Sequence, residues 1–378
     1  MKNPPFIRLN FWRFLLFFLF AAGLLLSCHS TGDANEQQEF VYQNPNDQLP
    51  FRDTQIIWGD SIFYAIGTSP PYWGGPNPGV KLYSSRDLKN WTTLGLLIDA
   101  GKLPDDVWYK DRFWAPELHR INQRFFLTFN CQNSGGGHYA AEDMLHHHAC
   151  GLAVAEHIEG PYTVVTHDEP LTPFPSNDLS LFVEDDGRVY CFFNNGWTDM
   201  HHIYVAELDT IHYRLKEAPV KLISQEPGKW DGSGIEGAYV VKRENTYYMF
   251  YSSWTRGYAV GYATAESVYG PWTKYENNPL FGAFIEDGVS YIFRDGQAIA
   301  DATSPYVTVG HNQVFTGPDG RLWVSFHGYV KGADEASMIM DPIWFEEGRI
   351  RTNAPTYSPQ AVPLDPDIRK RFPGLAGN

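Results

Sequence analysis

A short sequence pattern that returns five times constrains the fold of this chain more than any other feature. Each copy begins with a turn, continues with a strand that mixes aromatic and apolar residues, and ends in small or polar residues. The copies are WGDSIFYAIGTS (58–69), INQRFFLTFN (121–130), EDDGRVYCFFNN (184–195), KRENTYYMFYSS (242–253) and GPDGRLWVSFHG (317–328). Their starts lie about sixty residues apart, with a longer gap before the last copy. Such periods are typical of repeat architectures.

A second strand pattern separates the copies, at 80–95, 151–165, 202–216 and 259–275. Long amphipathic helical periods are scarce, and turn dipeptides such as DG, EN and NQ divide short β-rich runs. The sequence therefore predicts an all-β fold, a five-bladed β-propeller that forms a single domain over residues 40–378. A two-sheet β-sandwich is the competing all-β fold, but it does not explain a fivefold recurrence.

Two further segments are assigned to the same domain. Residues 281–312 are too long for a turn, so we expect them to hold the outer strands of one blade. The proline-rich C-terminal segment, 355–378, is expected to drape over the body of the propeller.

The first 27 residues read as an export signal rather than as part of the fold. A basic segment, MKNPPFIRLNFWR, precedes the apolar run 15–26, which is too short for a membrane span. Ser27 before Cys28 resembles a bacterial lipobox, which implies cleavage before Cys28 and a lipid on its thiol; an ordinary signal peptide is the alternative. Residues 28–39 would be a polar tether. We expect an exported protein, lipid-anchored to the bacterial cell envelope on its periplasmic or outer-membrane surface.

Charge and composition limit the classes of ligand that this chain is expected to bind. The net charge is −15 and no basic run is present, which argues against nucleic acid. An acidic chain with 12 Trp and 22 Tyr suits a neutral oligosaccharide or polysaccharide, although most of these rings could simply be core. Beyond Cys28, three cysteines without a CxxC motif argue against a disulfide framework or a zinc site. A single Cys131–Cys150 bridge stays open.

Three carboxylates stand just upstream of repeat strands and outside DG turns. They are Asp53 in LPFRDTQIIW, Asp178 in PSNDLSLFVED and Glu236 in GSGIEGAYVV. In a propeller, equivalent places in several blades converge on the central axis. Turn capping is the plain alternative for an aspartate, and it is weakest for Glu236 because glutamate rarely forms turns. Hydrolysis of an acetal needs such a set: an acid with a raised pKa, a base with an ordinary one and a neighbour that tunes the acid.

The chain resembles glycoside hydrolase family 43, the five-bladed propellers that trim plant polysaccharides. The resemblance covers roughly residues 40–350. It rests on FRDTQIIWGDSIFYAIGTS, YSSRDLKNWTTLG, FWAPELHRINQRFFLTF, NDLSLFVEDDGRVYCFF, IEGAYVVKRENTYYMFYSS and VGHNQVFTGPDGRLWVSFHG, of which WAPEL is the most distinctive.

The resemblance implies inversion, with Asp53 as the general base, Asp178 as the modulator of the acid's pKa and Glu236 as the general acid. His311 matches a family histidine near the axis, often beside a calcium ion or a water cluster; a structural role is the alternative. No cofactor is expected to be required, and a structural calcium stays open. Thr54 departs from the proline that often follows the family base. Invertase-like relatives, which retain configuration, fit less well because Glu236 lacks their Glu-Cys-Pro context.

Other features suggest substrate contacts. Trp73, Trp114, Trp197 and Trp254 follow or begin strands where they could meet a sugar, with core packing as the alternative for each. The His-rich loop 135–151 could bind a transition metal, but we favour a solvated rim that narrows the pocket and promotes exo action.

These observations predict an exo-acting, inverting glycosidase. Family frequency alone selects α-L-arabinofuranosidase, followed by β-xylosidase and then by galactofuranosidase or galactosidase activity. Endo-arabinanase action is a further alternative. A catalytically silent sugar-binding propeller is the alternative from another class, and the intact acidic trio argues against it.

Overall fold

Antiparallel β-strands make up almost all of the regular structure, which confirms the all-β prediction. The computed structural model describes residues 38–73, 77–133, 148–196 and 199–376 of the 378-residue chain. The predicted signal segment 1–27, Cys28 and nearly all of the tether lie outside the described residues. Within the described ranges, no helix has the length and apolarity needed to cross a membrane.

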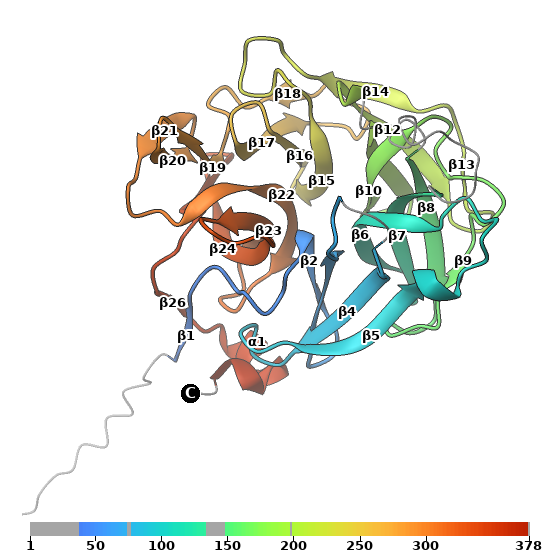
Figure 1. Ribbon diagram of the computed structural model, residues 1–378, viewed down its shortest axis with the longest axis horizontal. Helices are drawn as coiled ribbons and strands as arrows, with labels where there is room; N and C mark the ends of the chain where they lie inside the picture. Colours follow the sequence, from blue (N-terminus) through green and yellow to red (C-terminus); the bar gives the residue numbers. More distant parts are fainter. Residues whose placement is uncertain (1–37, 74–76, 134–147, 197–198, 377–378) are drawn as a thin grey trace, which may run out of the picture. The chain divides into compact units, whose positions relative to one another are not determined.

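Consecutive strands form antiparallel blades (Figure 1). The first sheet contains β2 (Arg52–Trp58), β3 (Phe63–Thr68), β4 (Gly79–Ser85) and β5 (Thr92–Asp99), followed by the short 3-10 helix η1 (Ala100–Lys102). The second contains β6 (Asp111–Ile121), β7 (Arg124–Gln132), β8 (Ala149–Ala155) and β9 (Thr163–Val164). The third contains β10 (Ser176–Val183), β11 (Val189–Asn195), β12 (His202–Asp209), β13 (Arg214–Leu215) and β14 (Val220–Ser224).

The remaining strands belong to one continuous hydrogen-bonded sheet that contains two further antiparallel series. The first series is β15 (Glu236–Arg243), β16 (Thr246–Ser253), β17 (Tyr258–Ala265), β18 (Thr273–Lys274) and β19 (Phe281–Glu286). The second is β22 (Tyr306–Thr316), β23 (Leu322–Val330), β24 (Ser337–Glu346) and β25 (Arg349–Thr352). Strand β19 joins them, because it pairs with both β17 and β22.

The long segment before the last repeat, residues 281–312, is divided between the fourth and the fifth series of strands. Strand β19 is an outer strand of the fourth series, as expected for 281–312, and β20 (Val289–Arg294) and β21 (Gln297–Ala300) extend it. The end of the segment, however, already belongs to β22, the first strand of the fifth series.

The first strands of the series form a closed ring. Strand β2 packs against β6, β6 against β10, β10 against β15, β15 against β22, and β22 returns to β2. This ring is the centre of a β-propeller, and its closure agrees with the fivefold repeat in the sequence. The repeated pattern itself falls on the second strands, β3, β7, β11, β16 and β23. The inner strand of each blade is therefore the strand that precedes the sequence copy.

Every inner strand carries a β-bulge at the same place. The pairing gains one extra residue between Arg52 and Gln55, Trp114 and Glu117, Asn177 and Ser180, Glu236 and Tyr239, and Gly310 and Gln313. The residue that opens each bulge has a left-handed backbone: Asp53 (φ 53°), Ala115 (40°), Asp178 (58°), Gly237 (64°) and His311 (54°). A bulge breaks strict alternation and re-aims side chains, so the inner strands lack a clean sequence period.

The hydrophobic core lies between neighbouring blades rather than at the axis. Separate apolar clusters join adjacent blades, and their fully buried rings include Phe129, Phe193, Tyr251, Phe326 and Trp323. Cys131, Cys150 and Cys191 are buried in these layers as free thiols, so the Cys131–Cys150 bridge that the sequence left open is absent.

The two ends of the described chain pair with each other in a small sheet of their own. Strand β1 (Glu39–Tyr42) pairs with β26 (Gln360–Pro363), and the segment beyond it forms α1 (Pro366–Arg371) and η4 (Pro373–Ala376). Asn44 then bonds to the last blade: its Nδ2 donates to the carbonyl of Met340 at 2.9 Å and to Thr356 Oγ1 at 3.0 Å. Its Oδ1 accepts from the amide of Met340 at 3.0 Å. In the C-terminal segment, Phe372 stacks on Phe63 of β3, so this segment covers the body of the propeller as expected.

The buried bonds of Asn44 predict a large effect on stability. Asn44→Ala would leave several buried polar groups without partners, at roughly 1–3 kcal/mol each before relaxation. We expect the free energy of unfolding to fall by about 2–4 kcal/mol in urea titration followed by tryptophan fluorescence. Asn90→Ala, which removes an exposed bond to Asp87, is the control and should change it by less than about 0.5 kcal/mol. Equal effects of the two substitutions would contradict this role for Asn44.

Candidate active site

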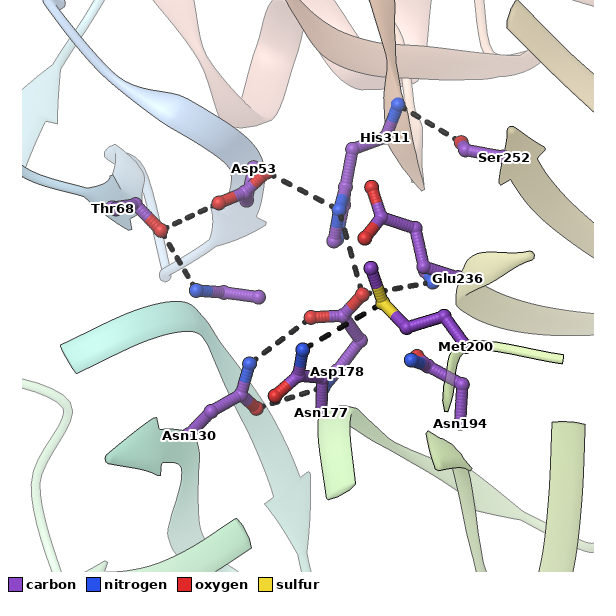
Figure 2. Close-up of polar contacts among 12 residues, drawn as sticks. Asp53, Thr68, Asn130, Asn177, Asp178, Asn194, Met200, Glu236, Ser252 and His311 are labelled. Carbon is purple, nitrogen blue, oxygen red and sulfur yellow. Dashed lines mark hydrogen bonds and ion pairs between the residues drawn. The ribbon is translucent and has the colours of Figure 1, made fainter. Parts of the chain in front are cut away.

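Three carboxylates and one imidazole converge at the axis of the ring (Figure 2). Asp53 comes from β2, Asp178 from β10, Glu236 from β15 and His311 from β22, and all four are buried. His311 Nδ1 lies 3.2 Å from Asp53 Oδ1 and 3.9 Å from Asp178 Oδ2. The sequence placed the carboxylates just before strands; they lie within the inner strands, at or beside the bulges.

The bulges explain how these side chains reach the axis. Residues paired with the start of each bulge sit near the end of the second strands: Thr68, Asn130, Asn194, Ser252 and His327. In four cases this side chain accepts the hydrogen bond of the bulge amide in the next blade. The bonds are Ala115 to Thr68 (2.7 Å), Asp178 to Asn130 (2.8 Å), His311 to Ser252 (3.0 Å) and Asp53 to His327 (3.0 Å). Each one fixes a backbone that a non-glycine residue adopts only at a cost.

The fifth position differs, and it lies between Asp178, the expected pKa modulator, and Glu236, the expected general acid. The amide of Gly237 donates to Asp178 Oδ2 at 3.0 Å instead of to Asn194, whose buried Oδ1 has no partner among the described residues. Asn130 Nδ2 holds the other oxygen of Asp178 at 3.0 Å. Asp178 is therefore fixed through both oxygens and is tied to the residue that follows Glu236.

Asp53 is held as a carboxylate. Burial alone would raise its pKa, but the neighbouring His311 and Arg52 outweigh burial and lower the pKa to about 2. Thr68 Oγ1 donates to Asp53 Oδ2 at 2.6 Å while it accepts the amide of Ala115. Asp53 can therefore accept a proton at neutral pH but does not carry one beforehand.

The pKa of Glu236 is shifted in the opposite direction. Burial, and then repulsion from Asp178, raise its pKa to about 7. The Tyr258 hydroxyl donates to Glu236 Oε1 and fixes the carboxyl group. Burial also raises the pKa of Asp178. Two carboxyl groups in one site, with pKa values pushed apart, are the arrangement expected of a base and an acid.

Two adjoining cavities border these groups. The larger, of about 380 Å³, reaches Glu236 and is walled by Arg52, Trp73, Trp254, Tyr258, His327 and Tyr329. The smaller, of about 20 Å³, lies against Asp53, Asp178 and His311. That volume accommodates about one water molecule. The site thus offers space for a water at the base and for a larger ligand at the acid.

The tryptophans predicted to contact sugar are placed differently from one another. Trp73 is 47% exposed and lines both cavities, and Trp254 lines the larger one. Trp114 borders the smaller cavity, but it is buried, and its indole NH donates to the carbonyl of Tyr72 at 3.0 Å. Trp197 lies outside the described residues, as does all of the His-rich loop up to residue 147.

The sequence left open whether a calcium ion binds near His311. Asp178, Glu236 and His311 each offer one ligand atom, and these atoms lie within 4.8 Å of one another. Calcium takes six to eight oxygen ligands. Here both oxygens of Asp178 and one of Glu236 already accept hydrogen bonds from the protein. This donor set therefore does not fit calcium.

Several residues of the site are not among those that the sequence predicts. Arg52, Asn130, Tyr258 and His327 all touch the carboxylates or line the cavities. The available signal is positional: Asn130 is the last residue of the second copy of the repeat, and Thr68 and His327 are the next-to-last residues of the first and fifth copies.

Comparisons of the sequence and of the structure with known proteins identify a family to which this chain is similar. The sequence model of the family described as Glycosyl hydrolases family 43 matches residues 42–346 of this chain. A xylosidase/arabinosidase of Humicola insolens is 26% identical over 69% of this chain and 44% of its own length, so the chain spans less than half of that protein. A β-D-galactofuranosidase of Aspergillus niger is 28% identical over 70% of this chain and 71% of its own. The crystal structure of a thermostable family-43 glycoside hydrolase superposes with a TM-score of 0.69 at 26% identity, covering 86% of this chain and 99% of that one.

The opposite pKa shifts predict the pH dependence of catalysis. With Asp53 as the expected base (pKa of about 2) and Glu236 as the expected acid (pKa of about 7), activity should be high between these two pH values. Above pH 7, kcat/KM on natural glycosides should fall about tenfold per pH unit. Asp178→Asn removes the charge that raises the pKa of Glu236, so this basic limb should move to lower pH. Asp168→Asn, at an exposed carboxylate, is the control. A basic limb that stays in place in Asp178→Asn would contradict the assignment.

Proposed function

Because the chain belongs to glycosyl hydrolases family 43, we propose that it is an exo-acting, inverting glycosidase whose preferred substrate is a terminal α-L-arabinofuranoside. Asp53 is the general base, Glu236 the general acid, and Asp178 raises and maintains the acid's pKa. The observation that carries this proposal is the pairing, at the wall of one small cavity, of a carboxylate with a pKa of about 2 and a carboxyl group whose pKa is raised to about 7.

The proposed reaction is a single displacement. Asp53 takes a proton from a water molecule, whose oxygen attacks the anomeric carbon. Glu236 gives its proton to the glycosidic oxygen on the other side, and the bond between that oxygen and the anomeric carbon breaks. Asp53 ends protonated, Glu236 ends ionised, and exchange with solvent restores both. The recess of about 20 Å³ beside Asp53 supports the place of the water.

The choice of sugar rests on the relatives and on the cavity. The two curated relatives described above are named for xylosidase/arabinosidase and galactofuranosidase activities, and arabinofuranose and galactofuranose share a five-membered ring. A cavity of about 380 Å³ lies at the small end of the roughly 300–1,000 Å³ found for ligand pockets, which favours a terminal unit. Export and a lipid anchor at Cys28 remain part of the proposal.

The acid role of Glu236 is tested by substrates that differ in their leaving group. Glu236→Gln should lower kcat/KM for natural oligosaccharides by about 10²–10⁴-fold because no group protonates the leaving oxygen. A dinitrophenyl glycoside leaves without protonation and should lose far less. Glu286→Gln, at a half-exposed carboxylate, is the control. Equal losses on both substrates would remove Glu236 as the acid.

A panel of aryl glycosides tests the sugar. We expect turnover of α-L-arabinofuranoside to exceed that of β-D-xylopyranoside and β-D-galactofuranoside. A different leading substrate would change the specificity and leave the mechanism intact. Binding of sugars without turnover of any panel member would support the silent propeller instead.

A further inference from the structure

His327 is unusual among the side chains that hold the bulges. The equivalent residues are Thr68, Asn130, Asn194 and Ser252, which are all small. A hydroxyl or an amide therefore suffices to accept a bulge amide in this fold. The histidine does the same for Asp53 and brings a second ring nitrogen that this task does not need.

The bond to Asp53 determines which ring nitrogen carries the proton. The amide of Asp53 donates to His327 Nδ1 at 3.0 Å, and an imidazole nitrogen that accepts a hydrogen bond has no proton of its own. His327 is therefore neutral, with its proton on Nε2. Burial, and then the charge of Arg52, lower the pKa of His327 well below its usual value, which agrees with the neutral ring. His327 Nδ1 also lies 3.6 Å from Asp53 Oδ1, but it has no proton to donate there.

The remaining donor belongs to a ring that lines the ligand cavity. His327 is 1% exposed and lines the cavity of about 380 Å³ beside Arg52 and Tyr258. Its ring lies 5.5 Å from that of Tyr258, whose hydroxyl bonds Glu236. Within the described residues, Nε2–H has no hydrogen-bond acceptor in the protein. A donor without a protein acceptor at the wall of a cavity can donate its hydrogen bond to a ligand or a water molecule there.

We propose that His327 positions the general base through Nδ1 and binds an oxygen of the substrate sugar through Nε2–H. This inference rests on the proposed function, because it assigns a role within the same site. One ring would then couple the place of the sugar to the place of the base. His327 takes no proton in the reaction; it sets the distance and direction over which Asp53 acts.

The chain itself supplies a substitution that separates the two roles. Asn130 shows that asparagine at the equivalent position accepts a bulge amide, at 2.8 Å from Asp178. His327→Asn should therefore keep the support of Asp53 and lose the donor to the sugar. His327→Ala should lose both. His202→Asn is the matched control, since His202 bonds Ser224 through Nδ1 on β12, away from the cavity lining.

Steady-state kinetics on the best aryl glycoside test these roles. We expect kcat of His327→Ala to fall by about 100-fold, the usual effect of misplacing a reacting group by about 1 Å. His327→Asn should recover kcat to within about tenfold of the wild type but keep a KM raised about 5- to 20-fold. The acid limb of the pH profile should move little in both, because His311 and Arg52 lower the pKa of Asp53 more than His327 does.

Each role can fail separately. If His327→Asn folds like the wild type by circular dichroism and melting but has the kcat of His327→Ala, the positioning role is wrong. If His327→Asn has the KM of the wild type, the substrate bond is wrong.

The tautomer of His327 is tested without an activity assay by ¹⁵N–¹H correlation spectra of the imidazoles. We expect a proton on Nε2 from pH 5 to 8, and a proton on Nδ1 would overturn the inference. A wild-type enzyme that cleaves no glycoside would instead refute the proposed function.

Discussion

The capture of one backbone amide in each blade is the interaction on which the site depends. A left-handed residue in the middle of a strand leaves its amide outside the ladder, and a buried amide without a partner costs about 1–3 kcal/mol. The second strand of the preceding blade supplies the acceptor in four of the five cases. Because each bond crosses from one blade to the next, the ring of inner strands and the direction of Asp53, Asp178 and His311 are fixed together.

The one bulge amide that does not follow this pattern, that of Gly237, links Asp178 to the strand of Glu236. Where Asn194 could have accepted the amide of Gly237, Asp178 accepts it and is drawn toward the strand that carries Glu236. A second carboxylate in a buried site raises the pKa of the first. Asp53, on the other side of His311, has cationic neighbours, and these lower its pKa. The same low-dielectric environment therefore separates an acid from a base because their partners differ in sign.

The sequence predicted the architecture better than it predicted the shell around the carboxylates. Sixty-residue periodicity and turn chemistry pointed to a propeller, and Asp53, Asp178 and Glu236 stood out because carboxylates before apolar strands are hard to explain otherwise. The inner strands were not recognised, since a bulge removes the alternation that marks a strand. Asn130 and His327 were missed because each looks like the polar end of a repeat, and only the pairing between blades shows what its side chain accepts.

The configuration of the sugar at the moment of release tests the account most directly. The proposal needs Asp53 to activate water on one face while Glu236 protonates the oxygen leaving from the other, so the first product must have the opposite anomeric configuration to the substrate. Proton NMR during the first minutes of hydrolysis, before mutarotation, distinguishes the anomers. We predict that an α-L-arabinofuranoside, or whichever glycoside the enzyme cleaves best, yields the inverted anomer first. A first product that retains the configuration of the substrate would contradict the roles given to Asp53 and Glu236.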